Sequence, residues 1–267
     1  DIQYLNGLGK KVLISIGGAN GTVELNNEEE KQSFVTTMIN IIEKYGFNGI
    51  DIDLEGSSLS LDSGDTDFKN PTTPKVVNLI DAVNEICAHF GPDFMLTMAP
   101  ETVYVQGGYG SYGGPWGAYL PVIYALRNQM DYIHVQHYNS RSIVALDGKA
   151  YSQGTADFHV AMAEMLLQGF PVGGNQDQIF PALRSDQVAF GIPACPSAAG
   201  GGYTEPAKVK KALDYLIKGI PYGGNYQLIK SSGYPDFRGI MTWSINWDAA
   251  SGYEFSTNYS SYFNNLN

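Results

Sequence analysis

Three carboxylates alternate with aliphatic residues in one short segment of the chain. Residues 48–55 read Asn-Gly-Ile-Asp-Ile-Asp-Leu-Glu, which places Asp51, Asp53 and Glu55 at every second position. This period of two predicts a strand with one apolar and one acidic face. Alternate residues of a strand lie about 6.5 Å apart, so the three carboxyl groups interact, and their mutual repulsion predicts that one keeps a proton near neutral pH. A carboxyl group that keeps its proton suits general-acid catalysis.

Residues 48–55 have two other interpretations, a solvated strand and a calcium loop. A half-exposed strand with solvated acids is the first, but a helical run ends at Tyr45-Gly46-Phe47 and a long loop opens at Gly56. Glu55 therefore lies at the carboxyl end of a short strand between helices, where α/β folds hold their active sites. A calcium loop of the EF-hand type is the second. The interleaved Ile and Leu residues favour a strand, and no Glu stands at the bidentate position, so we expect no metal and no cofactor.

Composition narrows the class of ligand. The 267 residues carry a net charge of -11, which argues against a nucleic-acid partner, because phosphate binding needs clustered Lys and Arg. Only 16% of residues are charged while Gly (31) and Tyr (18) are plentiful, a composition that favours a neutral polyhydroxy ligand. No apolar run approaches the roughly 20 residues of a membrane span. We expect Cys87 and Cys195 to be unpaired thiols, since two cysteines do not establish a disulfide framework.

Strand-like and helix-like runs alternate along the whole chain. This alternation predicts one α/β domain with a parallel sheet. A closed barrel of this type has eight strands, so with six either the sheet is open or two units are absent. The predicted strands are Lys11–Gly18, Gly49–Glu55, Phe94–Pro100, Tyr132–Tyr138, Val188–Ala194 and Arg238–Ile245, and the predicted helices cover residues 34–45, 76–90, 116–128, 155–168, 205–218 and 257–264.

Two long loops follow predicted strand ends and are therefore candidates to line a cleft. Ser57–Pro74 is polar, and Gln106–Gly117 is rich in glycine and aromatic residues. On the fourth predicted strand, His134, Gln136 and Tyr138 share one face, whereas His137 points to the other, so the two histidines do not form a metal pair.

Residues 48–55 resemble the Asp-Gly-x-Asp-x-Asp-x-Glu signature of the family 18 glycoside hydrolases, the chitinases and their relatives. Four further segments resemble family motifs in the same order, and they are Ser15-Ile16-Gly17-Gly18 (third strand), Met98-Ala99-Pro100-Glu101 (fifth), Gln136-His137-Tyr138-Asn139 (sixth) and Met241-Thr242-Trp243-Ser244 (eighth). Asn48 stands where the family usually has Asp, which leaves its hydrogen bonding and the proton sharing of Asp51 open.

The resemblance implies an α/β fold of the (β/α)8 TIM barrel type. It also implies that the first two β/α units are absent from the chain, together with any signal peptide before them.

The resemblance also implies the roles of individual residues. Glu55 is expected to be the general acid and then the base, Asp53 to orient the 2-acetamido group of the substrate, and Asp51 to share a proton with Asp53. Tyr138 is expected to support the acetamido oxygen, and Trp243 to form the floor under the sugar. Further expected substrate contacts are Gln136, Asn139, Ala99, Glu101 and Tyr104.

The activity implied is hydrolysis of β-1,4-linked N-acetylglucosamine polymers with retention by a substrate-assisted, endo-acting chitinase. Residues 1–267 would form one catalytic domain, a partial barrel of family strands three to eight without the insertion domain found in some members. We therefore expect an open groove lined by Tyr104, Trp116 and Trp243.

The expected partners are chitin or its oligosaccharides, with no nucleic acid and no membrane, and the protein is expected to be a secreted monomer. The alternatives are an endo-β-N-acetylglucosaminidase acting on N-glycans and a non-catalytic chitin-binding protein of the same fold.

Overall fold

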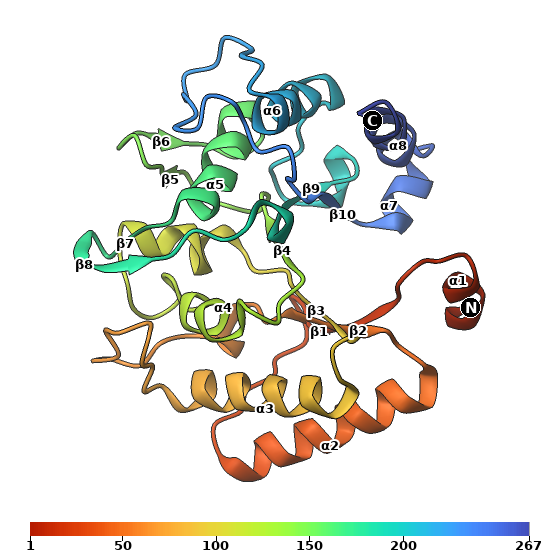
Figure 1. Cartoon of the computed structure of the whole chain (residues 1–267), viewed down its shortest axis with the longest axis vertical. Helices are drawn as coiled ribbons and strands as arrows, with labels where there is room; N and C mark the ends of the chain where they lie inside the picture. Colours follow the sequence, from red (N-terminus) through yellow and green to blue (C-terminus); the bar gives the residue numbers. More distant parts are fainter. Residues whose placement is uncertain (267) are drawn as a thin grey trace.

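A six-stranded parallel sheet forms the centre of the computed structural model, which describes residues 1–266 (Figure 1). The strand order is β1-β2-β3-β4-β9-β10, and every neighbouring pair is parallel. All six predicted strands are confirmed, although each is shorter than expected. Their bounds are β1 (Leu13–Gly17), β2 (Gly49–Asp53), β3 (Met95–Met98), β4 (Tyr132–Gln136), β9 (Val188–Pro193) and β10 (Gly239–Trp243).

Helices connect successive strands and cover the sheet (Figure 1). The signals that begin and end α2 are local: Asn27 accepts a hydrogen bond from the Glu30 N–H at 3.0 Å, and Gly46 ends the helix at φ 75°. Three glutamates in its first turn stabilise α2, because their negative charges interact favourably with the positive end of the helix dipole. The helices are α1 (Ile2–Gly7), α2 (Glu28–Tyr45), α3 (Pro74–Phe90), α4 (Leu120–Leu126), α5 (Ala156–Gln168), α6 (Pro206–Lys218), α7 (Ile245–Ala250) and α8 (Glu254–Asn264), with short 3-10 turns at 56–58, 102–104, 106–109, 185–187 and 196–198.

The structure differs from the sequence prediction in its smaller elements. The helix expected over 116–128 begins only at Leu120, because Gly117 adopts φ 75° and lies within the preceding turn. Two antiparallel hairpins were not predicted, since their strands are as short as two residues and carry no usable periodicity. They are formed by β5 (Ile143–Val144) with β6 (Ala150–Tyr151) and by β7 (Phe170–Val172) with β8 (Asn175–Phe180).

The acidic face of β2 is buried inside the protein. It is not a solvent-exposed face, although alternating apolar and acidic residues often indicate one. Ile50 and Ile52 are fully buried on one side, and Asp51 is only 8% exposed on the other. Parallel strands that are covered on both faces are buried on both sides. The alternation in β2 therefore distinguishes an apolar buried face from a polar buried face. Cys87 and Cys195 are buried and unpaired, as predicted.

The outer strands of the sheet are β1 and β10, so the sheet is open between them. Large apolar side chains near β10 are exposed, among them Trp243, Ile245 and Trp247. Among residues 1–266, no helix combines the length and the hydropathy that a bilayer crossing requires.

Candidate active site

The carboxyl ends of β1, β2, β4 and β10 surround a cleft of about 320 Å³. Glu55 lies two residues beyond Asp53, the end of β2, in an extended conformation, so its side chain stays on the same side as that of Asp53. The cleft is lined by Gly17, Gly18, Ala19, Asn20, Gly21, Asp53, Glu55, Gln136, Tyr138, Asn139, Ala198 and Trp243. The structure thus brings together residues from four of the five sequence motifs.

Asp51 lies below the cleft, and three side chains from three other strands hold it. Its carboxylate accepts hydrogen bonds from Ser15 Oγ at 2.8 Å and Thr97 Oγ1 at 2.6 Å, and His134 Nε2 lies 2.9 Å away. Burial by itself would raise the pKa of Asp51, but these partners, His134 first, outweigh it and the pKa is lowered. Asp51 is therefore an anion held in place, and no hydrogen bond joins it to Asp53 in the described part of the chain.

Asp53 and Glu55 form the carboxyl pair of the cleft. Burial raises the pKa of Asp53 to about 8, with further contributions from the charges of Glu55 and Asp51 and from a hydrogen bond with Glu55. The pair therefore holds one proton at neutral pH, as the spacing predicted. Asp53 is hydrogen-bonded to Glu55, whereas Asp51 is held by Ser15, Thr97 and His134, and the proton sharing expected between Asp51 and Asp53 stays a prediction.

Gln136 joins the pair to the neighbouring strand. Its Nε2 lies 3.0 Å from Asp53 Oδ1, 2.9 Å from Glu55 Oε1 and 2.8 Å from the carbonyl oxygen of Ala99. The amide has two protons for these three acceptors. Gln136 therefore fixes the relative position of the two carboxyl groups and anchors both to the backbone after β3.

Gly17 lets β1 approach the end of β2. Its φ is 108°, and a Cβ at this position would lie 2.2 Å from the carbonyl oxygen of Asp53. Any side chain would therefore displace Asp53 as well as strain the backbone. This gives a physical reason for the glycine in the first motif.

Tyr138 and Asn139 continue the wall of the cleft after β4. Tyr138 is buried except for the part that faces the cleft, and burial followed by the charge of Asp53 raises the pKa of its phenol, which stays neutral. Asn139 has a φ of 50°, and its Oδ1 accepts a hydrogen bond from the Gly200 N–H at 2.8 Å. Asn139 also lines a neighbouring cavity of about 370 Å³.

Two tryptophans present aromatic surface at the two cavities. Trp243 ends β10 beside the catalytic cleft and is 53% exposed. Trp116 is 37% exposed in the neighbouring cavity, which Glu101 and Arg141 also line. Burial and then the charge of Glu55 raise the pKa of Glu101. Exposed aromatic faces beside carboxyl groups are suited to sugar rings.

Two of the expected substrate contacts lie elsewhere. Tyr104 is only 4% exposed and lines neither cavity, and its hydroxyl donates to the carbonyl oxygen of Gly56 at 2.8 Å. It supports the loop after Glu55, so its predicted place on the groove was wrong. Ala99 is also buried, and its carbonyl oxygen accepts from Gln136. It fixes a cleft residue from behind and does not line the cleft.

Sequence reasoning missed the residues that hold Asp51. Ser15 stands in the first motif and Thr97 in the predicted strand Phe94–Pro100, but neither was predicted to contact Asp51. His134 was placed correctly on the face of Gln136, and that shared face was the available signal for contact with the acidic strand. Asn48, the departure from the family pattern, accepts a hydrogen bond from the Val12 N–H at 2.8 Å and joins β2 to β1.

Removing the His134 imidazole is expected to destabilise the protein. His134→Phe keeps a ring in place but leaves the buried Asp51 carboxylate without its first partner, which costs about 1.5–3 kcal/mol of unfolding free energy for a hydrogen bond to a charged group. Urea denaturation at pH 7 measures this change. His89 also contacts a carboxylate, Glu43, but at the exposed surface, so His89→Phe is the control and is expected to change stability by less than about 0.5 kcal/mol. Equal effects of the two changes would contradict the assigned contact.

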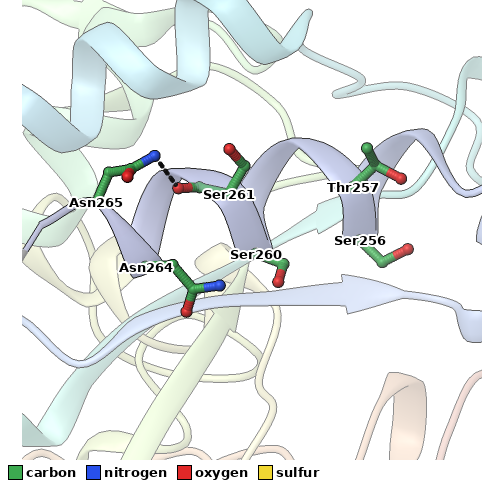
Figure 2. A pocket seen from close by; sticks show the side chains of 6 residues that line it. All are labelled: Ser256, Thr257, Ser260, Ser261, Asn264 and Asn265. Atoms are coloured by element: carbon green, nitrogen blue, oxygen red, sulfur yellow. Dashed lines mark hydrogen bonds between the residues drawn. The ribbon is translucent and has the colours of Figure 1, made fainter.

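A larger hollow on the surface is far less suited to chemistry than the cleft. The side chains that line this hollow lie along α8 and just beyond its end (Figure 2). Its volume is about 640 Å³, and Asn265 Nδ2 donates a hydrogen bond to the carbonyl oxygen of Ser261 at 2.8 Å. Its lining consists of Ser256, Thr257, Ser260, Ser261, Asn264 and Asn265. None of these residues is an acid or base at neutral pH, so size alone does not identify the site. Residues 1–266 also contain no group of three or more His, Cys, Asp or Glu side chains placed to hold a metal ion.

A family model described as "Glycosyl hydrolases family 18" matches residues 6–256. The chain belongs to glycosyl hydrolase family 18. The family 18 resemblance seen in the five motifs is thereby confirmed over nearly the whole chain, and so is the expected fold type, although the six strands described here form an open sheet.

Named relatives and solved structures agree with this family 18 assignment. "Chitinase Chi52" of Paenibacillus xylanexedens is 63% identical and "Chitinase D" of Niallia circulans 62% identical, each over 100% of this chain and 51% of the relative. The chain thus spans about half the length of the curated relatives it matches. A family 18 chitinase structure from Chromobacterium violaceum is 43% identical with a TM-score of 0.87, covering 96% of this chain and 66% of that one.

Proposed function

We propose that this chain hydrolyses the β-1,4 linkages of chitin by a substrate-assisted mechanism that retains the configuration of the anomeric carbon. The observation that carries this proposal is the Asp53–Glu55 pair, which shares one proton in a cleft and is bridged by Gln136. Family membership and the chitinase names of the relatives support the substrate class. A pair that holds one proton supplies an acid and an acceptor side by side, as this reaction needs.

In the proposed reaction, Glu55 donates its proton to the glycosidic oxygen. Asp53 accepts a hydrogen bond from the acetamido N–H of the substrate, and the acetamido oxygen attacks the anomeric carbon, which avoids an enzyme nucleophile. The neutral Tyr138 phenol donates to that acetamido oxygen, and Trp243 supports the sugar ring. Glu55 then removes a proton from the water that opens the oxazolinium ion. Asn139 and Glu101 are proposed to contact neighbouring sugar units in the second cavity.

Product analysis tests the proposed function. Oligomers of three to six N-acetylglucosamine units are incubated with the protein, and mass spectrometry identifies the fragments while proton NMR follows the first anomer formed. We expect internal cleavage with the β-anomer first. An α-anomer as the first product would exclude retention, and intact oligomers together with a cleaved N-glycan core would favour the endo-β-N-acetylglucosaminidase activity instead.

The rate should fall at alkaline pH. Since the pKa of Asp53 is raised to about 8, the carboxyl pair keeps its shared proton below that pH and loses it above. We expect kcat/KM to decrease by about tenfold per pH unit above pH 8, because no acid remains to protonate the leaving oxygen. Initial rates from pH 5 to 10 measure this, with melting temperatures at each pH to separate titration from unfolding. A rate that rises through pH 8 would contradict the assignment.

We further propose an open groove and a secreted monomeric enzyme. Between β9 and β10 the chain forms α6 and loops, which supports a single domain without an inserted wall. Chitin is an insoluble polymer outside the cell, so hydrolysis there requires export. Product ratios on crystalline chitin test the groove, since an open groove predicts short processive runs. Light scattering of the complete protein, and its presence in culture supernatant, test the other two points.

A further inference from the structure

A buried polar cluster lies on the far side of β4 from the catalytic cleft. It consists of His137 after β4, His159 on α5 and Thr204 before α6, all at most 3% exposed. His137 Nδ1 lies 3.1 Å from His159 Nδ1, and His159 Nε2 lies 2.9 Å from Thr204 Oγ1. Both imidazoles stack on Phe190, at ring-centre distances of 5.0 and 4.9 Å. The proposed reaction uses none of these groups.

The hydrogen bonds of the cluster have a single consistent direction. Thr204 Oγ1 donates its one proton to the carbonyl oxygen of Gly202 at 3.2 Å, so it accepts from the His159 Nε2–H. Burial lowers the pKa of both imidazoles, that of His159 to about 3, so both are neutral. A neutral His159 with a proton on Nε2 offers a lone pair on Nδ1, to which the His137 Nδ1–H donates.

The chain of hydrogen bonds ends at the segment that holds the backbone of Tyr138. A Cβ on Gly202 would lie 2.5 Å from the Tyr138 Cα, so the two segments touch. The Asn139 N–H also donates to the carbonyl oxygen of Gly201 at 3.1 Å. The Tyr138 hydroxyl, in contrast, has no hydrogen bond to another described residue. Its position in the cleft depends on how its backbone and ring are held from behind.

We propose that the His137–His159–Thr204 cluster is a positioning device for the Tyr138 hydroxyl. The cluster fixes Gly202 against the Tyr138 backbone, and the backbone aims the phenol at the place of the acetamido oxygen. This inference rests on the proposed function, since it assigns the cluster a part in that reaction. Thr204 is a positioning residue, because it touches neither substrate nor reacting atoms.

Two contrasting changes at Thr204 test the proposal. Thr204→Val keeps the shape but removes the hydroxyl, whereas Thr204→Ser keeps the hydroxyl. We expect Thr204→Val to lower kcat on oligosaccharides by about tenfold, since small misplacements of catalytic groups have effects of this order or larger, and to change KM by less than about twofold. Thr204→Ser should restore kcat to within about threefold of the unsubstituted protein. An unchanged kcat in Thr204→Val would overturn the proposal.

A double-mutant cycle with Tyr138→Phe separates positioning from general damage. If Thr204 acts through the Tyr138 hydroxyl, Thr204→Val should change kcat by less than about twofold once that hydroxyl is gone. The same tenfold loss in both backgrounds would show a merely structural role and overturn the proposal. Melting temperatures of all variants are measured alongside.

A second pair of changes covers the case in which Thr204→Val does not fold. His159→Gln keeps an N–H that reaches Thr204, and His159→Leu does not, so only the second should lose kcat, again without a further loss in the Tyr138→Phe background. Equal activities of the two would overturn the proposal. Failure of the proposed function itself is distinguishable, because it appears as absent turnover in the unsubstituted protein.

Discussion

Replacement of Glu55 by glutamine is expected to lower kcat on chitin oligosaccharides by about 10²–10⁴-fold, the range typical of a lost general acid. The amide retains the shape of the carboxyl group but supplies no acidic proton. Gln136 Nε2, 2.9 Å from Glu55, can still donate to the amide oxygen, so the cleft should keep its geometry. Oligosaccharide binding is therefore expected to remain within about threefold, as measured by isothermal titration calorimetry.

Glu43→Gln is the matched control for this change. Glu43 is exposed on α2, where it contacts His89 at 2.9 Å, and it does not line the cleft. Its replacement removes one carboxylate without touching the proposed chemistry, and turnover should stay within experimental error. Comparable turnover by the Glu55→Gln and Glu43→Gln variants would remove Glu55 from its proposed role.

Asp53→Asn is expected to lose activity and yet gain stability. Activity should fall by about 10²-fold or more, because the acceptor of the acetamido N–H loses its charge. Stability should rise because the pKa of Asp53 is about 8 in the folded protein and near 3.8 in the unfolded chain. Between these values the folded state holds a proton that the unfolded state releases, so the unfolding free energy decreases as pH rises from about 4 to about 8.

The size of this gain follows from the same linkage. At pH 7 the penalty that asparagine removes is about 4 kcal/mol without screening, and on the order of 2 kcal/mol for a partly exposed group. Urea denaturation at pH 7 and pH 4 measures it, and the difference between the variant and the unsubstituted protein should vanish near pH 4. The exposed Asp93 provides the control, since Asp93→Asn should change stability little at either pH. A destabilised Asp53→Asn variant at pH 7 would contradict the shared-proton description.

The elements that depend on local pattern were predictable from the sequence. All six strands of the sheet were predicted because apolar runs bounded by Gly, Pro or Asn carry their own signal. The carboxylates of the cleft were predictable for the same reason, because period-two spacing fixes their common face. Tyr104 was misplaced because its position three residues after the Met98–Glu101 motif shows that it is near the site but not which way its ring points.

Side-chain contacts that depend on how the strands pair were not predictable from the sequence. Asp51 receives Ser15 from β1, Thr97 from β3 and His134 from β4, and these contacts exist only in one register of the sheet. The pairing of Asp53 with Glu55 likewise follows from Asp51 being fully engaged below. Such contacts depend on pairing between strands that are far apart in the sequence. The pattern within a short segment does not show which residues of other strands will lie beside it.

The Gln136 amide has one proton too few for the acceptors around it, and this shortage has a consequence for ligand selection. With two N–H groups facing three oxygens, Gln136 cannot donate a full hydrogen bond to Asp53, to Glu55 and to the Ala99 carbonyl oxygen at the same time. A ligand N–H placed beside Asp53 supplies a further donor, and an N–H group brings no lone pair of its own that would compete for the Gln136 protons. We therefore expect amide-bearing sugars to bind the cleft more tightly than plain glucose polymers of the same shape.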